Sequence, residues 1–401
     1  MSGPGAPAPR VAAGRSLVAD FSLPALVAGF VTVLVGYTSS AAIVFQATQA
    51  LGASPAEVAS WLWALGLGMG LTCIALSLRY REPVVTAWST PGAAMLITSA
   101  AGVPMAEAIG GFVVCAVLMT LAGFTGAFER VMSRLPLSLA SGMLAGVLLR
   151  FGLDVFGAMK TDLSLVLPMF VAYLALRRLQ PRYAVVGALA LGVAIVGARG
   201  LLRLDAVELA LTTPLWTTPR VSIAALFGIA LPLFVVTMAS QNIPGVAVMR
   251  ASGFHAPASP LVGWTGAATL LLAPFGAFAL NLAAITAAIC MGREAHEDPQ
   301  RRYVAAVCAG GFYLLLGLFG ATVAALFAAF PKALVLAIAG LALLGTIGNG
   351  LAAALSSDTE REPALVTFLV TASGVAFAGV GSAFWGLVAG VATLIVLRAG
   401  R

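Results

Sequence analysis

Thr237-Met-Ala-Ser-Gln-Asn-Ile-Pro-Gly-Val-Ala-Val-Met-Arg250 is the stretch that decides the fold of this chain, because it places polar side chains inside a long apolar run. Hydrocarbon offers no hydrogen-bond partner to a side-chain amide, so Gln241 and Asn242 should face a cavity lined by protein. Pro244 and Gly245 follow closely, and this helix-breaking pair predicts a local disturbance of the backbone that breaks the span. The stretch therefore predicts a binding site inside a membrane transporter.

The composition predicts an integral membrane protein. Of the 401 residues, 61% are hydrophobic and 9% are charged, and the mean hydropathy is +1.03. Soluble domains carry roughly 25% charged residues. The apolar runs are long and continuous rather than alternating, which predicts an all-α fold and argues against a barrel. The net charge of +7 is spread thinly over the loops, so it predicts orientation in a lipid bilayer and no nucleic-acid partner.

About fourteen apolar segments are candidates for membrane spans, since a spanning helix needs about 20 apolar residues. They lie near 21–50, 58–78, 84–100, 105–128, 136–153, 163–176, 183–198, 222–249, 258–274, 275–291, 303–329, 333–355, 363–379 and 381–398.

The basic residues predict the orientation of these segments. Most of the 22 Lys and Arg lie in joints on the same side as the tail 1–20, which lacks the cleavage pattern of a signal peptide. Both termini are therefore expected in the cytoplasm. The predicted outer side holds Arg150, Lys160, Arg199, Arg203, Arg220 and Lys332.

The longest joint, at about 199–221, divides the chain into two halves of seven predicted spans. Seven is odd, so the halves should have opposite orientations, and inverted repeats of this kind place a substrate site near the bilayer midplane. Aligning Ser40 with Gln241 also superposes Trp63 on Trp264, which agrees weakly with a repeat.

The third and tenth segments are short and interrupted. Ser89, Thr90, Pro91 and Gly92 follow an extended stretch, and Thr90 is expected to cap a helix with Pro91 at its first position. In the tenth segment, Asn281 is expected to cap a short helix after an extended Pro-Phe-Gly stretch.

Two helices that begin at membrane depth would present unpaired N–H groups and partial positive charge to a shared cavity. Such a cavity would bind a carboxylate or another anion without a lysine or arginine. Bonding of Thr90 and Asn281 to neighbouring helices is the alternative interpretation. Phe275 and Phe278 are the aromatic residues best placed to contact a flat ligand, although aromatic side chains near such breaks more often serve plain packing.

No metal-ligand cluster, P-loop or nucleophile–base pair is present, which predicts a protein without cofactor, metal or enzymatic activity. The acidic residues lie at or near the ends of the segments, so the proton carrier stays unassigned, with Glu107 as a weak candidate. The predicted substrate-binding residues are Ser40, Ser89, Thr90, Pro91, Gly92, Ser240, Gln241, Asn242, Phe275, Phe278 and Asn281.

The stretches Ala239–Phe254 and Ala87–Ala94 resemble the benzoate/proton symporter (BenE) family, and the similarity in length and span order covers nearly the whole chain. That family is similar in fold to the uracil and xanthine permeases and to the sulfate-permease anion transporters. The resemblance implies a seven-plus-seven inverted repeat in a bacterial inner membrane, and a dimer formed through gate domains. It implies core halves at 21–128 and 222–329, and gate halves at 129–221 and 330–401.

Within the resemblance, Gln241 falls where the nucleobase permeases place a glutamate that bonds the base. Asn281 falls beside a second acidic position, which is Leu280 in this chain. Both departures remove negative charge, which suits an anionic ligand. The expected function is proton-coupled uptake of benzoate or a similar small aromatic carboxylate by alternating access. A nucleobase or inorganic-anion transporter of the same fold and a passive anion channel are the alternatives.

Overall fold

The computed structural model describes residues 17–132, 136–180, 183–202, 207–293, 295–375 and 382–399. Helices dominate these residues, and each of the fourteen predicted segments contains at least one helix. The helices of the first half are α1 (Leu17–Asp20), α2 (Leu23–Ala50), α3 (Pro55–Tyr80), α4 (Thr90–Ser99), α5 (Met105–Phe124), α6 (Ala127–Met132), α7 (Leu137–Thr161), α8 (Leu163–Leu179) and α9 (Ala184–Ala198).

The second half begins with one long helix that contains two wider turns. This helix consists of α10 (Ile223–Ala225), η3 (Leu226–Ala230), α11 (Leu231–Thr237), η4 (Met238–Asn242) and α12 (Ile243–Ala251). The helices after it are α13 (Ala258–Leu272), η5 (Ala273–Phe275), α14 (Ile285–Met291), η6 (Pro299–Arg301), α15 (Tyr303–Leu318), α16 (Gly320–Ala329), α17 (Lys332–Ala354), α18 (Arg361–Ala372) and α19 (Ser382–Ala399).

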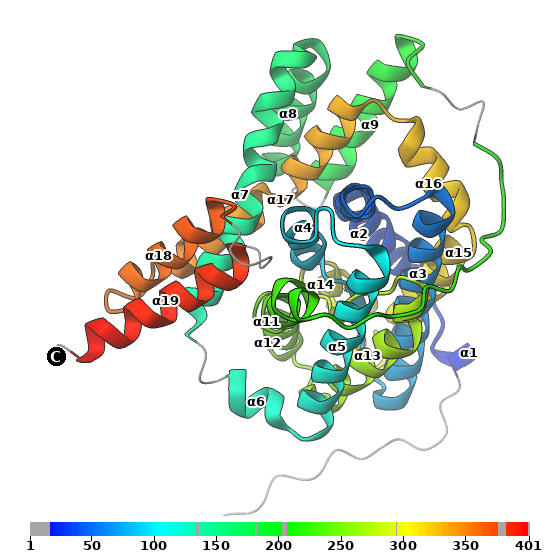
Figure 1. The fold of residues 1–401 in the computed structure, drawn as a ribbon. Coiled ribbons are helices and arrows are strands. Elements are labelled where there is room, and N and C mark those ends of the chain that lie inside the picture. The colour runs from blue at the N-terminus through cyan, green and yellow to red at the C-terminus, as the bar shows by residue number, and fades with distance from the viewer. Residues whose placement is uncertain are drawn as a thin grey trace, which may run out of the picture.

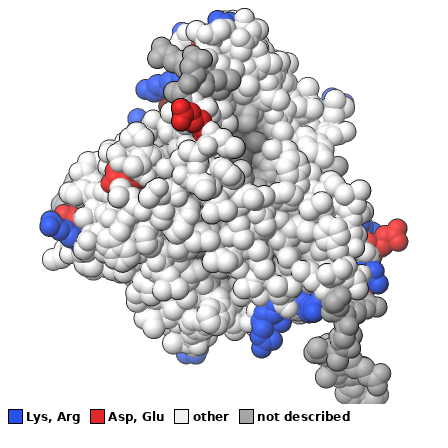
Figure 2. Space-filling view, turned by 90° about the vertical axis from the view of Figure 1, so that its right-hand side faces the viewer, with Lys and Arg blue, Asp and Glu red and all other residues white. Residues whose placement is uncertain are grey.

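Part of this set has the length and apolar character of membrane spans. Among the described residues, seven helices are long and apolar enough to span a bilayer, and the bent pair Pro299–Leu318 and Gly320–Ala329 makes an eighth if it is one span. Figure 2 shows one face of the molecule, where the charged side chains lie mainly toward the margins and uncharged residues fill the middle. The protein is an integral membrane protein, while the number of fourteen spans stays a prediction.

Two helix pairs pack unusually closely, and each pair joins one helix from each half. Helix α3 lies against α15, and α5 lies against α13 (Figure 1). A Cβ atom on Gly66 of α3 would lie 2.5 Å from the Cα atom of Gly317, and one on Gly123 of α5 would lie 2.1 Å from the backbone nitrogen of Gly263. The missing side chains therefore let the backbones touch, as small residues do in membrane bundles.

A second group of helices forms around α7. Helix α7 packs against α17 and α18, α18 packs against α19, and α8 packs against α9. In Figure 1, α18 and α19 lie on the side of α7 away from α3 and α15. Helix α2 joins the two groups through its contacts with α9 and α17.

The third and tenth segments meet as a short antiparallel pair of strands. Strand β1 (Thr86–Trp88) pairs with β2 (Leu280–Leu282), with Ala87 opposite Asn281. The backbone N–H of Ala283 also donates to the carbonyl of Val85 at 2.9 Å, which extends the pairing by one residue. The predicted extended stretches are thus present, and they lie side by side in the interior of the protein.

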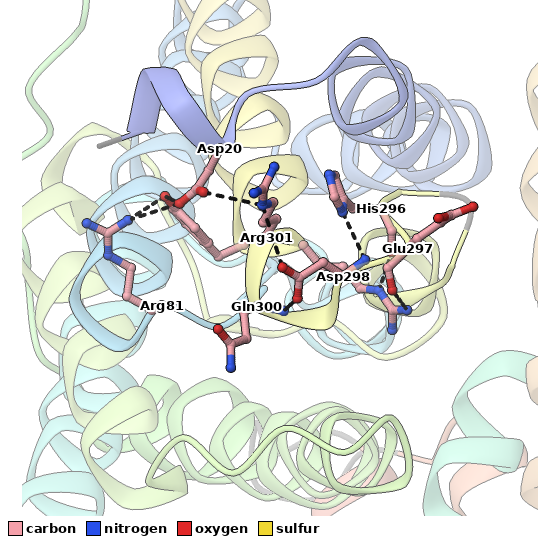
Figure 3. Close-up of polar contacts among 9 residues, drawn as sticks. Asp20, Arg81, His296, Glu297, Asp298, Gln300 and Arg301 are labelled. Atoms are coloured by element: carbon pink, nitrogen blue, oxygen red, sulfur yellow. Dashed lines mark hydrogen bonds and ion pairs between the residues drawn. The ribbon is translucent and has the colours of Figure 1, made fainter. Parts of the chain in front are cut away.

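A group of ionic contacts joins α1 to the end of α3 and the start of α15 (Figure 3). The Asp20 carboxylate is 4% exposed and lies 3.8 Å from Arg81 and 3.6 Å from Arg301. The Tyr303 hydroxyl donates to it at 2.9 Å, and Arg301 also pairs with Asp298 at 3.5 Å. A nearly buried charge needs such partners, so this cluster fixes the first described helix to the bundle.

Candidate functional site

The paired strands are held by polar side chains from the helix that decides the fold. The Thr237 hydroxyl donates to the Ser89 hydroxyl oxygen at 3.0 Å, directly after β1. The Asn242 Oδ1 atom accepts from the backbone N–H of Leu282 at 3.0 Å, within β2. Thr237, Ser89 and Asn242 are fully buried. The long helix therefore holds both segments, 86–92 and 280–282, and the place where these two segments meet the π turn 238–242 is called the crossing below. The three polar groups all have partners, as burial requires.

The helix that carries Gln241 is widened and not broken. The sequence predicted a broken span at Pro244, but 223–251 runs as continuous helix with a π turn at Met238–Asn242. The backbone N–H of Ile243 donates to the carbonyl of Met238, five residues back. Proline has no N–H for the carbonyl four residues before it, here Ser240, and its ring crowds that carbonyl. A wider turn accommodates both effects, and π turns are frequent at functional sites.

Ser240 and Gln241 are partly exposed, unlike Ala239 and Asn242 on either side of them. Neither side chain has a hydrogen-bond partner among the described residues, whereas Asn242 next to them is fully buried and bonded to β2. Strand β2 packs against the π turn η4 that carries both residues. The π turn thus carries an amide and a hydroxyl that no described residue uses, and their contact with a ligand stays a prediction.

The start of α4 differs by one residue from the prediction. Ser89 is the cap, and its hydroxyl accepts from the backbone N–H of Gly92 at 3.1 Å, so Thr90 is the first helical residue and Pro91 the second. Thr90 was predicted as the cap, but the hydroxyl of Ser89 already occupies that position. Pro91 and Gly92 are buried, and a Cβ atom on Gly92 would lie 2.5 Å from Leu233 of α11. Thr90 is partly exposed.

Asn281 does not cap a helix, contrary to the prediction. It lies in β2, and α14 begins four residues later after Ala284, which supplies no side-chain cap. The extended stretch comes later than expected, because Pro274 and Phe275 belong to the short helix η5. The Asn281 Nδ2 atom donates to the carbonyl of Ala279 at 3.0 Å. Its Oδ1 atom is buried without a partner among the described residues, which leaves one unused acceptor at the crossing.

The backbone before β2 is strained. Ala279 has φ of +40°, in the left-handed region that residues other than glycine seldom adopt. Such strain costs of order 1–3 kcal/mol and tends to gather at functional sites. It persists here because the flanking residues are fully buried, with Phe278, Leu280 and Asn281 all at 0% exposure.

Ser40 supports the opposite strand. Its hydroxyl donates to the carbonyl of Gly36 at 2.7 Å and accepts from the indole Nε1 of Trp88 at 2.9 Å. The Trp88 ring also meets Tyr37 edge to face, with 4.8 Å between the centroids. Ser40 was predicted to bind substrate, and in the structure its hydroxyl is occupied in orienting Trp88.

The two phenylalanines predicted to contact a ligand lie in separate aromatic groups. Phe278 is fully buried, with its ring centroid 5.7 Å from Trp61 and 5.8 Å from Phe112. Phe275 packs at 5.6 Å from Trp63 and 5.3 Å from Trp216. Both rings stabilise the segment before β2, and their contact with a ligand stays a prediction.

Glu107 lies in the first turn of α5 and holds the start of the long helix. The Ser222 hydroxyl donates to the Glu107 carboxylate at 2.5 Å, and the same hydroxyl caps α10 by accepting from the backbone N–H of Ala225 at 3.1 Å. This contact gives Glu107 a structural task, and a role in proton movement stays untested.

The sequence prediction missed one residue of the candidate site, Thr237, and one residue that stabilises the fold, Asp20. Thr237 lies one turn before Gln241 in the same polar run, and its helical spacing was the signal that would have placed it at the site. Asp20 was taken as a residue at the end of a span, and no local pattern marked its partners Arg81 and Arg301, far along the chain. Within the described ranges, no group of three or more His, Cys, Asp or Glu could hold a metal ion.

The overall arrangement is similar to that of two structurally characterised proteins. The murine Solute Carrier 26 family member A9 anion transporter, in an inward-facing state, matches with a TM-score of 0.60 and 14% identity, over 95% of this chain and 69% of that chain. The transmembrane domain of the cyanobacterial bicarbonate transporter BicA matches with a TM-score of 0.53 and 13% identity, over 92% and 97%. The fold is therefore that of the helical membrane domains of these two proteins.

The chain belongs to the BenE family, since the family model described as Benzoate membrane transport protein matches residues 19–396. It is 50% identical over 375 residues to the inner membrane protein YdcO of Escherichia coli (strain K12), which covers 94% of this chain and 96% of that protein. It is 39% identical over 383 residues to a benzoate membrane transport protein of Acinetobacter baylyi, with 96% and 97% covered. The predicted family is confirmed, and the protein is a membrane transport protein.

Proposed function

We propose that the protein imports benzoate or a similar small aromatic carboxylate together with a proton, by alternating access. The observation that supports this proposal is a pair of polar side chains, Ser240 and Gln241, which have no partner among the described residues and lie on a π turn packed against β2. The name of the 39% identical relative supports benzoate as the substrate.

The chemistry of the crossing suits an anion. Residues 237–242, 86–92 and 280–282 include no charged side chain. The Gln241 amide and the Ser240 hydroxyl would donate to the carboxylate, while the positive end of the α4 dipole adds partial positive charge, although the Gly92 N–H is already bonded to Ser89. A glutamate at position 241 would repel the same ligand, because two carboxylates in one site cannot both stay ionised at low cost. We also propose that the benzoate ring contacts Phe275 or Phe278, a contact that the sequence alone predicts.

The carboxylate would bind as an anion and then take the proton itself, so that the proton travels on the substrate. Protonated benzoate has one O–H donor, and the buried Oδ1 atom of Asn281 is an acceptor without a partner among the described residues. The crossing stretches hold no titratable side chain that would carry the proton in its place. Glu107 is the alternative carrier, at the margin of the protein.

The packing supports an inverted repeat. The second segment lies against the eleventh, as α3 on α15, and the ninth lies against the fourth, as α13 on α5. A twofold repeat of seven spans exchanges exactly such pairs. We therefore propose core halves at 21–128 and 222–329 and gate halves at 129–221 and 330–401, with fourteen spans, both termini cytoplasmic, a bacterial inner-membrane location and a dimer through the gates.

An inorganic-anion transporter is the second candidate. The structural neighbours are named as an anion transporter and a bicarbonate transporter, and the uncharged anion site described above suits those substrates as well. A nucleobase substrate would use the Gln241 amide differently, as donor and acceptor together. A passive anion channel would need no proton gradient.

Uptake by the purified full chain in proteoliposomes tests the proposal. Radiolabelled benzoate should enter proteoliposomes with an alkaline interior faster than it enters protein-free liposomes, where benzoic acid crosses the bilayer unaided, and this protein-dependent uptake should collapse when a protonophore removes the proton gradient. Gln241→Glu should reduce benzoate binding at least about tenfold more than Gln241→Ala, because it adds repulsion to a lost donor. Equal binding by the two variants, or equally strong competition by bicarbonate, sulfate or uracil, would contradict the proposal.

A further inference from the structure

A cavity of about 520 Å³ lies away from the crossing, between the end of α2, α4, the end of α16 and the start of α17. It is located at the end of the molecule that the charge distribution predicts to be outer. Its size falls in the range of about 300–1,000 Å³ typical of small-molecule sites. The residues that matter here are Phe45, Gln46, Gln49, Phe327, Phe330 and Lys332.

One side of this cavity is an aromatic wall. The rings of Phe45 and Phe327 are stacked with 6.1 Å between centroids and 29° between planes. Phe330 meets Phe327 edge to face at 5.8 Å and 74°. All three side chains are only partly buried, so their rings retain open surface. Aromatic rings favour offset and edge-to-face contacts, so the open surface of this wall suits a further flat ring.

The polar lining supplies hydrogen-bond donors and positive charge. Lys332 is exposed and has no ion-pair partner among the described residues. The Nε2 atom of Gln46 is buried and donates to no described group, which leaves a costly unmet donor unless something in the cavity accepts from it. Gln49 adds a second, exposed amide. The residues that line the cavity include no carboxylate, so the ligand that fits is an anion.

The cavity lies along the same helices that support the crossing. Ile97 lines it and is seven residues beyond Thr90 on α4, or about 10 Å at 1.5 Å per residue. Gln46 is six residues beyond Ser40 on α2, or about 9 Å. A ligand held here would therefore lie on the outer side of the crossing, between helices proposed for the core and the first helix of the second gate half.

We propose that this cavity is a second binding site for an aromatic carboxylate, a vestibule that holds the substrate on the outer side of the crossing. The ring lies against Phe45, Phe327 and Phe330. The carboxylate is paired with the Lys332 ammonium and accepts from the Gln46 amide. The role of the vestibule in transport rests on the proposed function, but its binding of ligand does not.

Equilibrium dialysis of radiolabelled benzoate against the purified full chain in lipid nanodiscs tests the vestibule. In the Gln241→Glu background, where the crossing is expected to lose benzoate, one benzoate per chain should remain bound. Adding Lys332→Gln should weaken that binding about tenfold, since it removes the charged partner, and adding Gln46→Leu should weaken it further. Lys160→Gln is the matched control, because Lys160 is also exposed on the predicted outer side but does not line the cavity.

Three outcomes would overturn the proposal that the cavity binds an aromatic carboxylate. These are loss of all binding in the Gln241→Glu background, equal binding with and without Lys332→Gln, and displacement by acetate as effective as displacement by unlabelled benzoate. The last outcome would mean that the aromatic wall does not take part. Failure of the proposed function would look different. Proton-driven benzoate uptake would then be missing, while binding that depends on Lys332 and Gln46 would persist.

Discussion

The side chain of Asn242 accepts a hydrogen bond of 3.0 Å from the backbone N–H of Leu282, and both residues are buried. One amide thus links the π turn that carries Gln241 to the second of the crossing strands. The contact explains how adjacent amides take different tasks, since Asn242 holds the framework and Gln241 stays free. The same relationship makes the two roles separable by experiment.

Asn242→Leu should lower the free energy of unfolding by about 1–3 kcal/mol, because it leaves the Leu282 N–H buried without a partner. Gln241→Ala should leave stability within about 0.5 kcal/mol, because the Gln241 side chain has no described partner. Thermal unfolding in detergent and benzoate binding, measured on both variants, check this. Loss of stability in Gln241→Ala with binding intact would reverse the assignment.

Ser89→Ala should destabilise the protein by about 0.5–2 kcal/mol, the usual loss on removing a helix cap. The Ser89 hydroxyl also accepts from Thr237, so the upper part of that range is expected. Thr90→Ala is the matched control and should change the melting temperature little, because Thr90 is the first helical residue and not the cap. An equal loss in both variants would restore Thr90 as a capping residue.

Gly310 and Gly311 are adjacent on α15 and should respond oppositely to alanine. A Cβ atom on Gly310 would lie 2.8 Å from the carbonyl oxygen of Gly70 and 2.6 Å from Ile74 of α3, whereas one on Gly311 would meet nothing within 4 Å. Gly310→Ala should therefore cost about 1–3 kcal/mol through overpacking. Gly311→Ala should be neutral or stabilising by up to about 1 kcal/mol, since alanine favours a helix. Melting temperatures of the two variants decide the matter.

Glu107→Gln should retain proton-driven uptake within about threefold, because an amide oxygen still accepts from Ser222 and the proton is proposed to travel on the substrate. Uptake and the measured ratio of protons to benzoate provide the check. A variant that exchanges benzoate across the membrane but no longer concentrates it would identify Glu107 as the proton carrier.

Asp20→Asn should reduce stability by about 1–3 kcal/mol, between the values for exposed and buried ion pairs, because Arg81 and Arg301 lose a nearly buried counter-charge. Asp298→Asn is the control. Asp298 is 37% exposed, and asparagine caps the following helix equally well, so its loss should stay near about 0.5 kcal/mol. Unfolding by heat and limited proteolysis of the N-terminal segment would show whether Asp20 fixes α1.

Much of the fold could be predicted from local sequence patterns. Apolar length placed a helix in each of the fourteen segments, and the β-branched and aromatic run at Thr86–Trp88 was correctly expected to be extended. The position of a cap was harder to predict. Ser89 and Thr90 are both good caps by type, and only the backbone geometry, with Ser89 extended and bonded to Gly92, distinguishes them.

Asn281 and Pro244 show where local reasoning fails. Asn281 was expected to cap a helix because asparagine favours that position, but pairing with Ala87 draws it into a strand. Pro244 was expected to break its helix, but a π turn absorbs the missing N–H without unwinding. In both cases a neighbour distant in the chain, or a small change of helical pitch, outweighed the preference of the single residue.

The sequence by itself determined that the chain enters a membrane, that it is built of helices, and that amides lie together in an apolar segment. These follow from the transfer of side chains and peptide groups out of water, which each segment undergoes on its own. The tertiary structure decided which polar groups are used up and which stay free. Asn242 meets Leu282, Ser40 meets Trp88 and Asp20 meets Arg301 only because folding brings distant segments within hydrogen-bond or ion-pair range, and Gln241 remains available because nothing described reaches it.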